Sequence, residues 1–361
     1  HKRAQRVRTA LYSLLGLLVL IVITIFSLDY FANFPRERFA RKYSYWQRAW
    51  YGFKSAARVV YLSLVTDLPD IKNTKLPVVE VYLKGKRLDK LTENLPDSGR
   101  IFQKGKVLIK RDNKQKTYKA QLKFRGDSVH HWAFPQKSWR VKLSGTALYN
   151  GIKEFNLNVP RSPTQLSNWL GYKMAQMAGI TTTPEAFFTQ FRLNRNFDGV
   201  RIFLEQPDYY FLRRKNLPLG KIFIGDIKTE DIYGLRRRKL LYKTPLAWEV
   251  RTPIPQYDNS RKEIKALIDT LEKNSWEPYK RFYALQDIVN IDSVLKVIAL
   301  LEIVGSVHID NTHNNKLYFN PYTGKFSVIP WDTLAYFWRN YGLDINRNFL
   351  FRDILTIPEW Q

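Results

Sequence analysis

Residues 9–28 form a run of 20 positions without a single charged side chain. An α-helix rises about 1.5 Å per residue, so this run spans roughly 30 Å, the thickness of the hydrocarbon core of a bilayer. We therefore predict a single transmembrane helix over residues 9–28, behind a basic flank over residues 1–8. A cleaved signal peptide is the alternative, but the apolar run is long and no small-x-small cleavage site follows it.

The segments after this helix are expected to connect it to a separate domain. Residues 29–66 interleave aromatic and basic side chains, which is typical of a helix at a lipid headgroup boundary or of an amphipathic helix packed on its own domain. Residues 67–75 are polar and indicate a linker, which leaves residues 76–361 for the main domain. Basic residues lie on both sides of the predicted helix, so the positive-inside rule does not decide its orientation.

The main domain reads as strands first and helices second. Short runs rich in β-branched and aromatic residues predict strands at 77–83, 106–111, 118–124, 138–143, 155–159, 186–193 and 200–204. A helix capped by Ser162-Pro163 and ended by Gly179 interrupts them, and apolar spacing predicts further helices at 262–273, 278–285 and 291–304. This order predicts an α+β fold with a two-lobed, atypical protein-kinase-like domain.

The chemistry is expected in the loop after the last of these helices. Residues 308–315 match the phosphoryl-transfer pattern H-x-D-x-x-x-x-N, with Asp310 and Asn315 at its key positions, and Asp332 follows. Residues 316–319 and 325–329 flank a turn-rich stretch and predict a β-hairpin, which brings its two open ends together. We therefore expect Asn315 and Asp332 to bind a divalent cation, Mg²⁺ or Mn²⁺, with Asp310 nearby to accept a hydroxyl proton.

The same loop permits a different metal chemistry. His308, Asp310 and His313 can each bind a transition metal, which would suit a hydrolase. The chain has only five histidines and no cysteine to complete such a site, so we rank this interpretation below nucleotide chemistry. In the nucleotide interpretation His308 is a packing residue that braces the loop.

Two further features fit contacts to the phosphates of ATP. Arg125 and Ser128 lie in a glycine-containing turn after a strand, where backbone N–H groups can meet phosphate oxygens, although an ordinary turn explains them equally well. Arg140 and Lys142 leave the same face of one strand and could clamp phosphates, and Glu205 could pair with Lys142. Solvated charge is the alternative for these three residues.

The charge of the chain favours anionic partners. It holds 59 Lys and Arg against 32 Asp and Glu, a net charge of +27, with basic runs at 213–215 and 236–239. Such charge suits a nucleotide, an acidic protein or an anionic lipid surface. Because a membrane anchor makes a genomic partner improbable, we expect an acidic or Ser-rich protein substrate and the bilayer as partners rather than nucleic acid.

Residues 118–337 resemble the CotH kinase family, a group of atypical, secreted or surface-associated protein kinases. The resemblance rests on stretches 124–128, 137–143, 166–170, 193–206, 310–315 and 330–332. It implies ATP-dependent, metal-dependent phosphorylation of a protein hydroxyl, with Asp310 as catalytic base or hydroxyl-orienting acid and Asn315 and Asp332 as metal ligands. It also implies a soluble domain on the extracytoplasmic side of the membrane.

One departure from the family pattern weakens the expectation of full activity. Many relatives continue Trp-Asp-x-Asp, whereas this chain has Leu334 at the last position. Leucine cannot bind a cation, which puts a second metal in question. The alternative function is therefore a weakly active or inactive relative that serves as an assembly or binding module for a surface protein or an anionic polymer.

Overall fold

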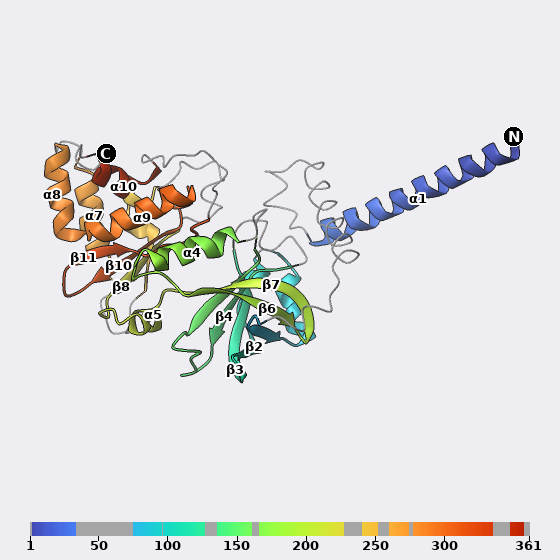
Figure 1. Cartoon of the computed structure of the whole chain (residues 1–361), viewed down its shortest axis with the longest axis horizontal. Coiled ribbons are helices and arrows are strands. Elements are labelled where there is room, and N and C mark those ends of the chain that lie inside the picture. The colour runs from blue at the N-terminus through green and yellow to red at the C-terminus, as the bar shows by residue number, and fades with distance from the viewer. Residues whose placement is uncertain are drawn as a thin grey trace. The chain divides into compact units, whose positions relative to one another are not determined.

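The computed structural model describes residues 2–33, 75–95, 97–126, 136–160, 166–226, 240–251, 260–273, 277–334 and 347–356 (Figure 1). The chain divides into two compact units. The first contains residues 1–76, 83–104 and 123–137, and the second contains residues 77–82, 105–122 and 138–361. The expected juxtamembrane segment beyond residue 33, the linker up to residue 74, Ser128 and the basic run 236–239 lie outside the described residues.

The first unit begins with one long helix, α1 (Lys2–Asn33). Its window Val7–Thr24 has a mean hydropathy of 2.1 and none of it is buried, so the helix is long and apolar enough to cross a membrane. A signal sequence near the N-terminus passes the same test of length and composition. The helix begins earlier and ends later than the predicted span, because no glycine or proline breaks it at either side. The unit also contains α3 (Gly85–Thr92) and the 3₁₀ turn η2 (Ser98–Arg100).

Seven strands of the chain close into a barrel. They are β1 (Val78–Tyr82), β2 (Gln103–Arg111), β3 (Lys114–Phe124), β4 (Trp139–Leu143), β5 (Glu154–Asn158), β6 (Ala186–Leu193) and β7 (Asn196–Glu205), in the order β1-β2-β3-β4-β5-β7-β6. The closing contact is the parallel pair β1 and β6. Rings of Phe155 and Phe187 both stack on Phe203, with centroids 4.3 and 4.4 Å apart. All seven predicted strands are present, and closure leaves no free sheet edge.

A second sheet of four antiparallel strands lies in the second unit. Its order is β11 (Lys325–Val328), β10 (Asn315–Asn320), β8 (Lys221–Gly225) and β9 (Trp248–Arg251). The predicted hairpin is confirmed as β10 and β11. The expectation of a mostly helical second half is corrected, because β8 and β9 belong to this sheet. Both strands are short, at five and four residues, and gave no clear period in the sequence.

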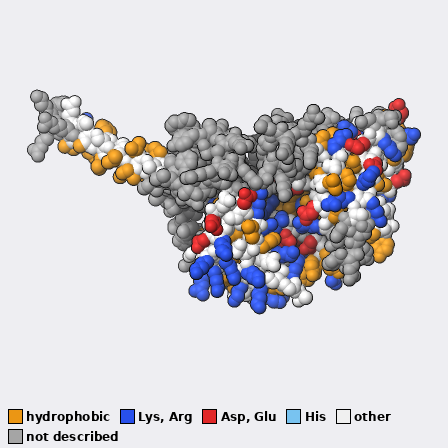
Figure 2. Space-filling view, turned by 180° about the vertical axis from the view of Figure 1, so that it is seen from behind, with side chains coloured by type: hydrophobic (Ala, Val, Ile, Leu, Met, Phe, Trp, Pro, Cys, Tyr) orange, Lys and Arg blue, Asp and Glu red, His pale blue; other side chains and the backbone are white. Residues whose placement is uncertain are grey.

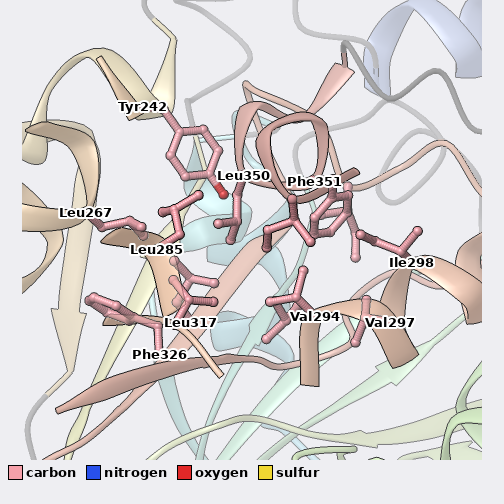
Figure 3. Close-up of a cluster of buried hydrophobic side chains, with 14 of the residues drawn as sticks. Tyr242, Leu267, Leu285, Val294, Val297, Ile298, Leu317, Phe326, Leu350 and Phe351 are labelled. Atoms are coloured by element: carbon pink, nitrogen blue, oxygen red, sulfur yellow. The ribbon is translucent and has the colours of Figure 1, made fainter. Parts of the chain in front are cut away.

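Helices cover one face of this sheet and form the largest core of the second unit. They are α7 (Lys262–Leu271), α8 (Pro278–Ile288), α9 (Ile291–Val304) and α10 (Phe349–Leu355). The 3₁₀ turn η4 (Leu241–Lys243) packs in the same core. Figure 3 shows their apolar side chains pointing toward Leu317 of β10 and Phe326 of β11. The other face, through Ile222, Ile224 and Tyr318, packs on α5 (Tyr209–Arg214).

The result is a strand-rich, mixed α/β fold. The remaining helix of the second unit, α4 (Ser167–Met177), contacts both α9 and β6. Lys and Arg side chains gather over β2 and β3 in Figure 2. The exposed lysines of these strands are Lys104, Lys106, Lys110, Lys114, Lys116 and Lys119. Neither strand contains an acidic residue, so this surface is strongly positive.

Candidate functional site

Asp332 lies in a tight turn that is fixed against helix α4. Its backbone has φ 52°, a left-handed conformation that Asp tolerates better than most residues. Its N–H donates to the hydroxyl oxygen of the buried Tyr172 at 3.0 Å. Helix α4 approaches so closely that a Cβ on Gly171 would stand 1.9 Å from the carbonyl oxygen of Thr333. The glycine is therefore required for this contact, and the contact sets the position of the Asp332 carboxylate.

Three side chains converge on that carboxylate, two from the loop between α9 and β10 and one from α4. His308 Nδ1 lies 2.9 Å and Asn314 Nδ2 3.3 Å from Asp332 Oδ2. Asn168 Nδ2, in the first turn of α4, donates to Asp332 Oδ1 at 3.3 Å. The remaining amide oxygen of Asn168 is buried and accepts from no donor in the part of the chain that the structure describes. A buried carbonyl oxygen without a donor is costly, and a cation is one group that would satisfy it.

Asp310 forms a self-contained turn at the start of the same loop. Its Oδ1 accepts hydrogen bonds from the N–H groups of Thr312 and His313, at 2.7 and 3.1 Å, and from their side chains, at 2.6 and 2.8 Å. Burial alone would raise the pKa of Asp310, but these bonds and the charge of His313 outweigh it and lower that pKa. Burial would likewise lower the pKa of His313, and Asp310 reverses the direction and raises it. The carboxylate therefore stays ionised.

The expected position of Asn315 beside Asp332 is corrected by the structure. Asn315 is the first residue of β10, is 3% exposed, and points into the helix-covered core. Its Oδ1 accepts from the Tyr242 hydroxyl at 3.0 Å and from Asn348 Nδ2 at 2.9 Å. Its Nδ2 donates to the carbonyl oxygens of Asp310 and His313. All four hydrogen bonds of the amide are thus made within the protein, and the neighbouring Asn314 is the residue that contacts Asp332.

The expected pair of Lys142 and Glu205 does not form. Lys142 is opposite Glu154 and Glu205 is opposite Phe155 in the barrel register, so the two side chains leave opposite faces of the sheet. Lys142 is exposed. Glu205 is 1% exposed and receives a two-pronged ion pair from Arg214, whose Nε lies 2.8 Å from Glu205 Oε1. The basic run 213–215 was assigned to anionic partners, whereas Arg214, in the short helix α5, pairs with Glu205 inside the fold.

Arg140 and Lys316 lie within electrostatic range of each other. Arg140 Nε donates to Asn156 Oδ1 at 3.1 Å, and Arg140 donates from its terminal nitrogen to Gln206 Oε1 at 2.9 Å. Lys316 Nζ lies 4.2 Å from the ring centroid of Trp331. Burial, followed by the charges of Arg251 and Arg140, lowers the pKa of Lys316 to about 7, although Asp226 and Glu249 act in the other direction.

In the part of the chain that the structure describes, no group of three or more His, Asp or Glu side chains is placed to hold a metal ion, so the structure does not support the hydrolase interpretation. His308 contacts Asp332 whereas His313 contacts Asp310. His308 therefore does more than the expected bracing of the loop. Arg125 belongs to the first unit, and the site described above is built from the second unit alone.

The comparison with protein families decides the classification. The family model described as "CotH kinase protein" matches residues 122–360. The chain belongs to this CotH family. It is also similar to "Inner spore coat protein H" of Bacillus subtilis (strain 168), with 25% identity over 288 residues that cover 79% of this chain and 74% of the relative. The resemblance inferred from short motifs is thus confirmed at the level of the family.

The matched range of the CotH family includes the whole constellation around Asp332. It also includes two residues that sequence reasoning did not select, Asn168 and Asn314. Asn168 lies in one of the stretches that carried the resemblance, and an amide at the start of a helix is the signal that could have identified it. Asn314 is one position before the residue that the spacing rule selects, and nothing in the motif distinguishes the two.

Proposed function

We propose that this protein is a membrane-anchored atypical protein kinase. It transfers the γ-phosphoryl group of ATP to a Ser or Thr hydroxyl of an acidic or Ser-rich protein, with Mg²⁺ or Mn²⁺. The observation that carries this proposal is the convergence on Asp332 of His308 and Asn314, from the loop that holds Asp310, and of Asn168, from helix α4. The description of the matched family as a kinase supports it.

The oxygen atoms around Asp332 fit a hard divalent cation. Magnesium in phosphoryl-transfer sites is typically bound by one or two carboxylates plus substrate phosphates. Asp332 supplies one carboxylate, and Asn168 supplies a buried amide oxygen to which no described residue donates. These two residues, with Asn314, would hold the ion. When bound, the cation neutralises charge on the phosphates of the substrate.

Asp310 is suited to orient the acceptor hydroxyl. Its Oδ1 accepts from four donors, and no described residue donates to its Oδ2. The acceptor oxygen forms a bond to Pγ, the bond between Pγ and the β,γ-bridging oxygen breaks, and ADP leaves. The hydroxyl proton passes to Asp310 and then to solvent. Because the pKa of Asp310 is lowered, we assign it mainly to positioning the hydroxyl rather than to strong base catalysis.

The test is labelled-phosphate transfer by the full chain in detergent or lipid. Wild-type protein, ATP labelled at the γ position and Mg²⁺ or Mn²⁺ should yield label on the protein itself or on an acidic, Ser-rich acceptor. Asp332→Asn should abolish transfer, and asparagine tolerates the left-handed backbone at this position. The matched control is Asp292→Asn on the exposed start of α9, which should transfer as wild type does. Equal labelling by wild type and Asp332→Asn would refute the proposed kinase activity.

A second function is favoured by Leu334 and by the lysine-rich surface of β2 and β3 (Figure 2). In this alternative the protein is an assembly or binding module for a surface protein or an anionic polymer. Calorimetric titration with ATP and Mg²⁺ distinguishes the two functions, because the binding module binds no nucleotide.

We place the domain on the extracytoplasmic side of the membrane, with α1 as its anchor. Protease protection of the domain in intact cells or vesicles tests that location.

A further inference from the structure

The side chain of one buried lysine on the second sheet has no hydrogen-bonding partner among the residues that the structure describes. Lys316 is 6% exposed, and its Nζ makes no hydrogen bond or ion pair with any residue of the described ranges. Its Nζ lies over the face of Trp331, at 4.2 Å from the ring centroid. An ammonium group carries three donors, and a ring face satisfies none of them as well as an oxygen does.

The same sheet holds a lysine that shows what ordinary pairing looks like. Lys221, in β8, is also largely buried, and its Nζ lies 2.9 Å from both carboxylate oxygens of Glu263. Buried charges are normally paired in this way, because an isolated buried ammonium is costly. Lys316 thus departs from the rule that its neighbour follows. An unpaired buried lysine next to a proposed active site indicates a ligand that accepts the hydrogen bonds of its ammonium group.

Two arginines and two carboxylates act on Lys316, so the group has one excess positive charge when Lys316 is counted, and both arginines are held in place. The register sets Lys316 opposite Ile224, which is itself opposite Glu249, and Arg251 lies one row further along the same face. Arg251 is fixed by Glu249 at 2.9 Å and by the carbonyl oxygen of Pro207 at 3.3 Å. Arg140 lies within electrostatic range of Lys316, and its bonds to the barrel fix it. Asp226 and Glu249 offset part of this charge without an ion pair to Lys316.

We propose that Lys316, supported by Arg140 and Arg251, binds a phosphate group. This inference rests on the proposed function in one respect: Trp331, which covers the ammonium, directly precedes Asp332, so the phosphate is assigned to the nucleotide that Asp332 serves. Lys316 supplies point-charge donors to phosphate oxygens, and the two arginines supply the positive field. The chemistry that it recognises is a phosphate chain, whether from a nucleotide or from a free polyphosphate.

The experiment compares three ligands on three variants of the full chain. Isothermal titration calorimetry measures binding of ATP with Mg²⁺, of tripolyphosphate and of adenosine. Lys316→Met should weaken binding of ATP and of tripolyphosphate at least about tenfold, which one charge-assisted hydrogen bond supplies, and should leave adenosine binding unchanged. Its thermal midpoint should stay at or above that of wild type, because an unpaired buried charge has been removed.

Two other lysine substitutions serve as controls. Lys221→Met breaks a buried pair with Glu263, so it should lower the thermal midpoint but keep the affinity for tripolyphosphate. Lys325→Met, at the start of β11, should change neither. The inference is overturned if Lys316→Met binds tripolyphosphate within twofold of wild type, or if wild type binds none.

The failure of this inference and the failure of the proposed function give different results. If transfer depends on Asp332 and Lys316→Met binds phosphates normally, the kinase stands and the role of Lys316 is wrong. If wild type binds tripolyphosphate through Lys316 but neither binds nor turns over ATP, the phosphate site stands and the kinase does not.

Discussion

Replacing Asn315 with alanine separates a structural asparagine from one that binds a metal ion. The amide of Asn315 links the loop at residues 310–313 to Tyr242 and Asn348 through four hydrogen bonds. A methyl group makes none of them. The structure therefore predicts that Asn315→Ala acts mainly on the free energy of unfolding, and acts on phosphoryl transfer only through the loop.

The size of the effect follows from burial. Tyr242 and Asn348 are each 1% exposed, so Asn315→Ala leaves two buried donors without acceptors. Each such group costs about 1–3 kcal/mol, which gives a loss of roughly 2–6 kcal/mol. The carbonyl oxygens of Asp310 and His313 lie nearer the surface and regain water at less cost. The loss is large against the roughly 5–15 kcal/mol by which a typical domain is stable.

The assay is chemical denaturation with and without Mg²⁺ and ATP, beside a transfer assay. The matched control is Asn314→Gly, because the backbone at residue 314 has φ 61°, which glycine adopts without strain. Asn314→Gly should lose about 1 kcal/mol or less but should lose cation-dependent transfer. Our reasoning is wrong if Asn315→Ala unfolds at the wild-type denaturant concentration while transfer disappears, since that result would put Asn315 on the ion.

Three further predictions concern the surrounding contacts. Arg214→Met leaves the buried carboxylate of Glu205 without its ion-pair partner and should lower the free energy of unfolding by about 3–5 kcal/mol in denaturant titrations. An unchanged free energy of unfolding would contradict the ion pair. Gly171→Ala forces a Cβ against a carbonyl oxygen and should cost about 1–3 kcal/mol in thermal unfolding together with lost transfer, whereas a wild-type midpoint would contradict the close approach. Asp310 raises the pKa of His313 above 6.5. The pair's contribution to the free energy of unfolding is therefore complete below pH 6.5 and is lost as the pH rises through the pKa of His313 in the folded protein. Asp310→Asn should lower that pKa in an NMR titration, and an unchanged pKa would refute the pairing.

Much of the fold was predictable because its local patterns agree with its final structure. The helix at Ile291–Val304 begins after the capping Asn290 and ends at Gly305 in a left-handed conformation, and both signals are visible in the sequence. The seven barrel strands show the alternation or β-branched content that strands require. Closure of the barrel was not predictable, because it depends on the parallel pair of β1 and β6, which are separated by more than a hundred residues and carry no local signature.

The site shows a sharper limit. A motif fixes the number of residues between two positions but not the direction in which either side chain points. Asn314 has a left-handed backbone and Asn315 begins a strand, so consecutive asparagines face different surroundings: one contacts Asp332 and the other enters the core. In a strand a shift of one residue exchanges the two faces of the sheet. The spacing of H-x-D-x-x-x-x-N therefore identifies the loop, and only the backbone conformation at residue 314 decides which asparagine belongs to the chemistry.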